Sequence, residues 1–128
     1  TTPFLTVILR KGYGLGAQAM AGGSFKAGML TVAWPTGEFG GMGLEGYVRL
    51  GFRKEMEAIA DPVEREKFYT AKVASLYENG KAISIASVFE IDDVIDPADT
   101  RRWIVAGLRS VPKPPPRTAR KRPCVDTW

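Results

Sequence analysis

A glycine-rich turn near the start of the chain contains the residues best suited to chemistry. Gly12, Gly14 and Gly16 follow a run of large apolar residues and precede a run of helix-forming residues. Glycines where a strand meets a helix leave backbone N–H groups unpaired, and the helix dipole adds partial positive charge there. Such donors stabilise an oxyanion without a side-chain acid or base, which suits a chain that contains no histidine. The turn therefore predicts either an oxyanion site or a helix start that uses glycine for close packing.

The same turn also fits the loose form of a dinucleotide-binding fingerprint. Gly12, Gly14 and Ala17 have the required spacing, and Glu38 follows about twenty residues after the turn, where an acid would bind a ribose. However, Arg10–Lys11 separates the preceding strand from the first glycine, and few strands remain for a nucleotide-binding domain. Dinucleotide binding is therefore the weakest of the hypotheses for this turn.

Composition excludes several classes of protein. The chain has 128 residues, of which 45% are hydrophobic and 25% charged, as in an ordinary globular domain. Its single cysteine, Cys124, excludes an internal disulfide framework. The longest clean apolar stretch, residues 4–9, is much shorter than the roughly 20 residues of a membrane span, and no signal-peptide pattern opens the chain. We expect no membrane association, no metal site and a cytoplasmic location.

The positive charge is concentrated near the C-terminus. A stretch without acids contains six basic residues: Arg109, Lys113, Arg117, Arg120, Lys121 and Arg122. The rest of the chain has 12 basic and 14 acidic residues, a net charge of −2. We therefore divide the chain into a folded part, residues 1–110, and a basic proline-rich tail, residues 111–128. The tail lacks the interleaved aromatic residues typical of nucleic-acid binding, so we expect a solvated arm or one lying over a neighbouring subunit.

Hydrophobic patterns predict the order β, α, β, α, α, β, α, which indicates an α/β fold. The first strand lacks clean alternation, so we expect it to be buried on both faces. Asp61-Pro62 and Asp96-Pro97 are typical helix starts, each with a capping acid and a proline at the first position. The predicted strands cover residues 4–9, 29–34 and 88–95, and the predicted helices cover 17–21, 42–59, 62–80 and a segment from 97 onward.

Four motifs occur in an order that resembles a known family. They are Arg10-Lys11-Gly12-Tyr13-Gly14, Ala33-Trp34-Pro35-Thr36, Gly41-Met42-Gly43 with Gly46, and Ile95-Asp96-Pro97 with Asp99-Thr100-Arg101. Together they strongly resemble the C-terminal end of the carboxyltransferase (β) subunit of biotin-dependent acyl-CoA carboxylases. Propionyl-, acetyl- and methylcrotonyl-CoA carboxylases belong to this family. The resemblance extends from about Thr2 to Ser110.

The resemblance implies a crotonase-like (ClpP/crotonase) fold of repeated ββα units, of which this chain is a partial C-terminal domain. It further implies a ligase or transferase of fatty acid metabolism that moves a carboxyl group from carboxybiotin to the α-carbon of an acyl-CoA. Its partners would be a biotin carboxylase and a biotin carrier, and its β subunits would form a hexamer. The location would be the cytoplasm in bacteria or the mitochondrial matrix in eukaryotes. The isolated fragment would be inactive, because it lacks the acyl-CoA half of the site.

The resemblance also assigns an oxyanion hole to the glycine turn. Two backbone N–H groups of the family's turn hold the ureido oxygen of biotin, and an ungapped alignment places them on Leu15 and Gly16. The family has a Gly-Ala pair there, and Leu15 could not adopt a conformation restricted to glycine. An alignment shifted by one residue would instead place the pair on Gly16 and Ala17.

Further site residues follow from the same resemblance. Gly14 and Ala17 flank the oxyanion pair, and Met42 and Gly43 open a helix beside the biotin region, so all four are expected to bind the cofactor. The position that lines the acyl pocket is Gln18. It is neither an acid nor a small apolar residue, so the identity of the acyl group stays open.

A hypothesis from another class remains alongside the enzyme. In this alternative the chain is a non-catalytic interaction module that binds its partner through the basic proline-rich arm. Electrostatic binding of this kind would weaken steeply with ionic strength.

Overall fold

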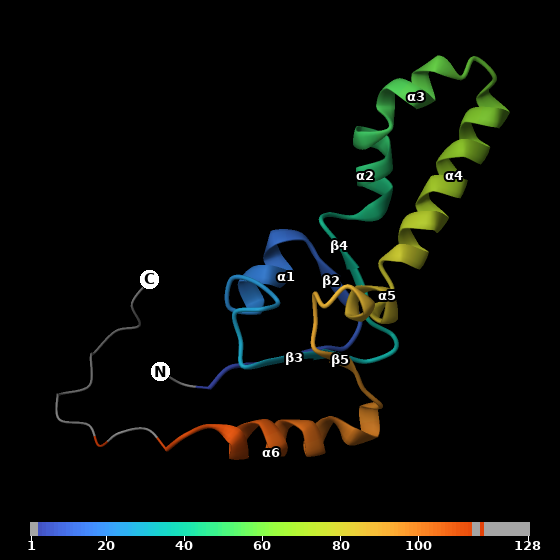
Figure 1. The fold of residues 1–128 in the computed structure, drawn as a ribbon. Helices are drawn as coiled ribbons and strands as arrows, with labels where there is room; N and C mark the ends of the chain where they lie inside the picture. Colours follow the sequence, from blue (N-terminus) through green and yellow to red (C-terminus); the bar gives the residue numbers. More distant parts are fainter. Residues whose placement is uncertain (1–2, 114–115, 117–128) are drawn as a thin grey trace.

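The computed structural model describes residues 3–113 and residue 116, which form two small parallel sheets with helices around them (Figure 1). The last helix ends at Ser110. Most of the predicted tail, including Cys124, lies outside the described residues. The boundary between residues 110 and 111 therefore stays a prediction.

The larger sheet has three parallel strands in the order β1-β3-β5. β1 (Leu5–Ile8) pairs with β3 (Leu30–Ala33) along its whole length, and β3 pairs with β5 (Asp93–Val94). β3 lies in the centre, and its residues from Thr31 to Ala33 are almost fully buried. β1 has no strand on its other side among the described residues, so it is an edge strand.

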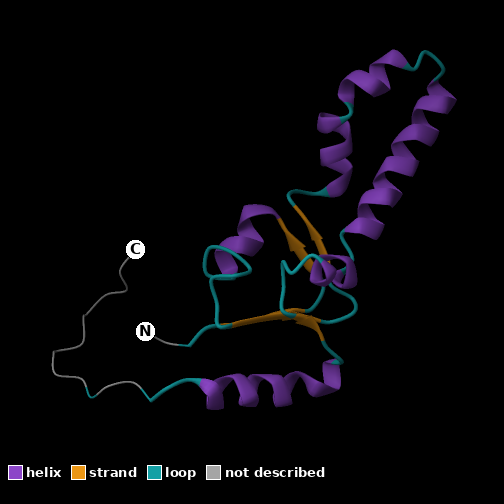
Figure 2. Cartoon of the chain, viewed as in Figure 1, coloured by secondary structure: helices purple, strands orange, loops and turns teal. Residues whose placement is uncertain are grey.

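The smaller sheet consists of β2 (Lys11–Tyr13) and β4 (Glu38–Gly40). These strands are parallel, with Tyr13 opposite Gly40 at their carboxyl ends. β2 leads directly into α1, which begins at Gly14, and β4 is followed by the glycine-containing turn 41–43 and then by α2, as the orange strands and purple helices of Figure 2 show. The smaller sheet therefore determines where two helices begin.

The helices occupy three regions around the sheets (Figure 1). α2 and α3 run alongside α4 as a helical hairpin that projects from the smaller sheet, whereas α6 runs along the larger sheet. The Trp34 indole N–H donates to the Thr100 hydroxyl at 3.0 Å, which ties the end of β3 to the start of α6. The helices are α1 (Gly14–Met20), α2 (Leu44–Gly51), α3 (Arg53–Ala58), α4 (Pro62–Asn79), α5 (Ala82–Ser87), the short 3₁₀ helix η1 (Pro97–Asp99) and α6 (Thr100–Ser110).

The hydrophobic core lies where the two sheets and α5 meet. Its buried members come from β1, β3, β4, α5 and the segment before β5, and they are Ile8, Ala33, Phe39, Ala82 and Ile91. The ring of Phe25 packs edge-to-face on Phe39 with centroids 5.4 Å apart. Since Phe39 is the middle residue of β4, this core holds the smaller sheet in place beneath the two glycine turns.

Both predicted helix starts are confirmed. The Asp61 carboxylate accepts a hydrogen bond from the Val63 N–H at 2.9 Å, and Pro62 is the first residue of α4. The Asp96 carboxylate likewise accepts from the Ala98 N–H at 2.8 Å before η1 and α6. In both places the side chain satisfies a backbone donor that the helix leaves unpaired.

The burial predicted for the first strand is wrong. Leu5, Thr6 and Val7 are only half-buried, and Phe4 and Leu9 at its ends are 46% and 51% exposed. The absence of alternation reflects an edge strand between two partly covered faces, not a central strand.

Three predicted elements need correction in their extent. The helix expected over 42–59 is interrupted at Phe52, whose φ of −108° and ψ of 23° leave the helical region after Gly51. The strand expected over 88–95 is only β5, because residues 88–92 form a turn that leaves α5. α1 begins three residues earlier than the helix expected over 17–21. The sequence patterns also missed β2, β4 and α5 altogether.

Within the part of the chain that the structure describes, no helix has the length and apolar character that crossing a membrane requires.

Candidate functional site

The structure brings together two glycine-containing turns that are distant in the sequence. They follow β2 and β4, whose carboxyl ends lie side by side. Gly14 opens α1 with a positive φ of 67°, and Gly43 precedes the first residue of α2. An ideal Cβ on Gly14 would lie 3.3 Å from the Gly41 carbonyl oxygen and 4.0 Å from the Met42 Cα. The turn of Gly14 thus needs glycine both for its conformation and for its contact with the second turn.

The first turn of α1 offers unpaired backbone donors. Within residues 3–113, the N–H groups of Leu15 and Gly16 have no hydrogen-bond partner. No side chain caps this helix start, and its first turn contains no acidic residue. Gly16 and the side chain of Leu15 are exposed. The start of α1 can therefore donate hydrogen bonds to water or to a negatively charged group of a ligand.

Leu15 does not adopt the left-handed backbone conformation that favours glycine. The residue with positive φ is Gly14, and Leu15 has an ordinary helical position in α1. A side chain at residue 15 is therefore compatible with a backbone donor there. Leu15 can therefore stand where the ungapped alignment has the glycine of a Gly-Ala pair, because its backbone is not in the left-handed region.

The start of α2 differs from that of α1 because an acid already occupies it. Glu45 lies in the first turn of α2, and its carboxylate accepts a hydrogen bond from the Tyr77 hydroxyl at 2.8 Å. Its own backbone N–H and the Tyr77 hydroxyl lower the pKa of this carboxyl. The hydrogen bond also raises the pKa of the Tyr77 phenol. Of the two adjacent helix starts, the start of α1 is thus the one without a resident anion.

Tyr13 joins the two strands beneath the turns. Its hydroxyl donates to the Glu38 carboxylate at 3.1 Å, and its ring lies against Gly40, where an added Cβ would come within 2.9 Å of the ring. Burial, followed by the hydrogen bond to Glu38, raises the pKa of the Tyr13 phenol. Glu38, which the dinucleotide hypothesis placed at a ribose, instead serves as the acceptor for Tyr13.

The remaining predicted site residues lie at or near the surface. Ala17 is half-buried in α1, and Gln18 is exposed beside it. Met42 is 40% exposed, and Gly43 is exposed at the start of α2. The contact between the turns brings Gly14 close to Met42.

Sequence reasoning missed Tyr13, Tyr77 and Glu45. Their hydrogen bonds join residues 25 and 32 positions apart, and no local pattern links such residues. The parallel pairing of β2 with β4 would have predicted the first bond, but these three-residue strands are too short to show a pattern.

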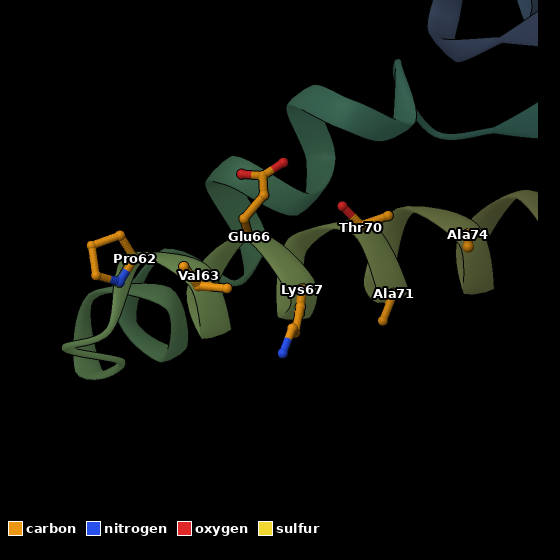
Figure 3. A pocket seen from close by; sticks show the side chains of 7 residues that line it. All are labelled: Pro62, Val63, Glu66, Lys67, Thr70, Ala71 and Ala74. Carbon is orange, nitrogen blue, oxygen red and sulfur yellow. The ribbon is translucent and has the colours of Figure 1, made fainter.

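A surface hollow lies away from these turns, on one face of α4 (Figure 3). Its lining is mostly apolar and comes from a single helix: Pro62, Val63, Glu66, Lys67, Thr70, Ala71 and Ala74. Glu66 and Lys67 are the charged members, and no nucleophile and base face each other there. Among residues 3–113 and 116, no three His, Cys, Asp or Glu side chains gather as a metal site would require. The two glycine turns therefore remain the candidate site.

Residues 1–124 match the family described as the carboxyl transferase domain. The methylmalonyl-CoA carboxyltransferase 12S subunit of Propionibacterium freudenreichii subsp. shermanii is 40% identical over 110 residues, covering 84% of this chain and 20% of that protein. The propionyl-CoA carboxylase carboxyltransferase subunit of Haloferax mediterranei is 38% identical over 109 residues, covering 85% of this chain and 20% of that protein. The chain thus spans about a fifth of the length of these curated relatives.

Solved structures show the same similarity. A crystal structure of transcarboxylase 12S, described as a hexamer with methylmalonyl-CoA bound, aligns with a TM-score of 0.76 at 34% identity. The alignment covers 97% of this chain and 24% of that chain. A single-chain, multi-domain long-chain acyl-CoA carboxylase aligns with a TM-score of 0.67 at 57% identity, covering 83% of this chain and 10% of that chain.

Proposed function

Because the chain belongs to the carboxyl transferase domain family, we propose that it is part of an enzyme that moves a carboxyl group from carboxybiotin to an acyl-CoA. The two facing glycine turns are the observation that best supports this function. They combine free backbone donors with a close approach of two main chains, and they require no acidic or basic side chain.

In this proposal the Leu15 and Gly16 N–H groups hold the ureido oxygen of biotin. Preorganised donors at this position would stabilise negative charge on that oxygen, and so would favour the transition state over the ground state. Fixed N–H groups need no reorganisation during the reaction. The absence of an acid in the first turn of α1 keeps their partial positive charge available.

The residues present fit such a group in two respects. Gly14 permits the close approach of Gly41 and Met42, and the side chains of Leu15 and Met42 provide exposed apolar surface beside the donors. Biotin, when bound, supplies the carboxyl group and a ureido nitrogen that can take the α-proton of the substrate. The chain therefore contributes position and dipoles, with Gly14, Ala17, Met42 and Gly43 around the cofactor.

The alternative alignment uses the N–H groups of Gly16 and Ala17. Gly16 belongs to both alignments, and it is the donor on which the two agree. Gln18 follows directly in α1, and we place it at the acyl pocket.

The rest of the active site would come from outside this chain. The 12S relative is described as a hexamer with methylmalonyl-CoA bound. We propose a similar homo-oligomer here, with an acyl-CoA substrate and a biotin carrier as partner. In this proposal the described residues supply only the biotin-binding side of such a site.

Carboxyl transfer by the full-length protein tests this function. Purified enzyme, its biotin carrier charged with labelled CO₂, and a series of acyl-CoAs from acetyl to long-chain should give labelled, acid-stable carboxyl product. Transfer to one length class would also define the acyl group. If the enzyme transfers the carboxyl group to none of the acyl-CoAs, although the biotin carrier is fully charged, the proposal is refuted.

A further inference from the structure

A cavity of about 280 Å³ in the helical hairpin is lined by three arginines. The helices α2 and α3 form one arm of the hairpin and α4 forms the other (Figure 1). Arg49 comes from α2, Arg53 from α3 and Arg65 from α4, so residues of both arms line the cavity. Met56 and Glu57 complete its lining. Its volume is close to the lower end of the roughly 300–1,000 Å³ that ligand pockets occupy.

Each guanidinium is held by a contact that uses only part of it. Arg65 donates through Nε and Nη2 to the Ile59 carbonyl oxygen at 3.1 and 2.7 Å. Arg53 donates through Nε to the Glu57 carboxylate at 2.8 Å. Arg49 lies over the ring of Tyr69, with its Cζ 5.4 Å from the centroid, a stacking contact that occupies none of its N–H groups. The three side chains are thus positioned in advance while donors on each stay available.

The charge of this lining is not balanced. Three arginines and one glutamate, Glu57, line the cavity, so its lining residues carry two net positive charges. The ion pairs elsewhere in residues 3–113 each join one cation to one carboxylate, as Lys26–Asp92 and Lys81–Glu78 do. Like charges gathered in one place repel one another, and a bound dianion would remove that repulsion.

We propose that the Arg49–Arg53–Arg65 cavity binds the phosphate group of a phosphate-bearing ligand. A phosphate carries about −1.5 to −2 charge at neutral pH, which matches the charge of the lining. Its oxygens accept the paired N–H groups of arginine in the bidentate geometry that the guanidinium favours. This inference does not rest on the role of the glycine turns, because the cavity lies in the helices that project beyond them.

Equilibrium dialysis of the full-length protein tests the site with three probes. Inorganic phosphate, pyrophosphate and adenosine 3′,5′-bisphosphate distinguish a free phosphate site from one that takes a nucleotide phosphate. Arg49→Gln should weaken binding of the preferred probe roughly tenfold or more, because a charge-assisted hydrogen bond is lost. Arg65→Gln should do the same, and unchanged melting of Arg49→Gln excludes a folding effect.

Two further variants separate a built site from general attraction. Lys54→Gln removes one positive charge from α3 outside the cavity lining, and it should leave the affinity unchanged. Glu57→Gln removes the single carboxylate and should strengthen binding several-fold. Equal affinity of Arg49→Gln and wild type would overturn the proposal, and so would an equal loss in Lys54→Gln. Carboxyl transfer activity does not enter the readout, so this result is independent of the proposed reaction.

Discussion

At the scale of single residues, the proposed oxyanion site depends on the backbone of Leu15 and not on its side chain. The group assigned to the oxyanion is a backbone N–H, and the residue with the special conformation is Gly14. A substitution that alters only the side chain at residue 15 should therefore matter little. One that removes an N–H should matter greatly.

Replacing Gly16 with proline tests this directly. Proline deletes the N–H, so Gly16→Pro should slow decarboxylation of carboxybiotin by roughly 100- to 1,000-fold, even without acyl-CoA. Leu15→Ala, the matched side-chain variant, should retain most of the rate. Both rates are measured on the full-length enzyme, after melting and oligomeric state are shown to be unchanged. A folded Gly16→Pro enzyme with near-normal transfer would exclude Gly16 as a donor.

Glu45 connects the two arms of the hairpin in a pH-dependent way. The backbone N–H of Glu45, followed by the Tyr77 hydroxyl, lowers its folded pKa below the ordinary value of 4.5, so both hydrogen bonds of the ionised carboxylate stabilise the fold at neutral pH. That contribution is present above the ordinary pKa and is lost as the pH falls through the lower folded value. Glu45→Gln should therefore speed hydrogen exchange in α2 and in the end of α4 at pH 7.

Hydrogen exchange at low pH supplies the control for this prediction. The difference between Glu45→Gln and wild type should shrink once the pH is below the folded pKa, because the wild-type carboxyl is then protonated as well. Glu66→Gln, an exposed glutamate of α4, should change exchange at neither pH. An effect of Glu45→Gln that is the same at both pH values would contradict the assigned pKa.

At the scale of the elements, Gly80 determines how α4 meets the smaller sheet. Its carbonyl accepts from the Phe39 N–H at 2.8 Å, and a Cβ on it would collide with the Phe39 carbonyl oxygen. Gly80→Ala should therefore destabilise the protein by about 3 kcal/mol, near the upper end for overpacking. Melting of the assembled protein measures the change.

Gly46 in α2 is the matched control. An added Cβ there would meet its nearest neighbour, the Met42 side chain, at an ordinary 3.7 Å. Gly46→Ala should be neutral or stabilising by up to about 1 kcal/mol, because alanine favours the helix. Equal melting of the Gly80 and Gly46 variants would show that space at Gly80 is not the reason for its glycine.

The long elements could be predicted from the sequence because their signals are local. Capping by Asp61 and the apolar face of α4 lie within one helix, and β1 and β3 are continuous apolar runs. The short strands β2 and β4 could not be predicted in this way. Their stability comes from pairing with each other and from packing of Phe39 in the core, contacts that no window of neighbouring residues contains.

The candidate site could be predicted in the same partial way. The glycines indicated where the backbone is unusual, and the resemblance indicated which N–H groups to examine. The contact between Gly14 and Gly41 depends on the register of two separate strands, and so do the partners of Tyr13. The resemblance already predicted that Met42 and Gly43 lie beside the same region as Gly14, whereas the contact between the two turns became visible only in the fold.

At the scale of the whole molecule, the unpaired edge of β1 is the feature that most favours self-association. Phe4 and Leu9 are half exposed, and β1 has one unpaired side among the described residues. An edge strand with apolar flanks pairs readily with another chain. We therefore expect the isolated 128-residue chain to self-associate, and sedimentation should show species that grow with concentration. A monodisperse monomer that unfolds cooperatively would contradict this expectation.

The interleaved strand pairing also implies an order of folding. β1 pairs with β3 and β2 with β4, so the first pairing needs the chain through Ala33 and the second needs it through Gly40. β5 comes much later, and the Thr31 N–H bonds to an Asp92 carboxylate oxygen across 61 positions. The helical hairpin lies between β4 and β5 in the chain, and its contacts join the successive helices α2, α3 and α4. We therefore expect it to form early and to shorten the effective loop that β5 must close. We thus expect the hairpin to affect folding kinetics, because its early formation would bring the last strand within reach of the sheet.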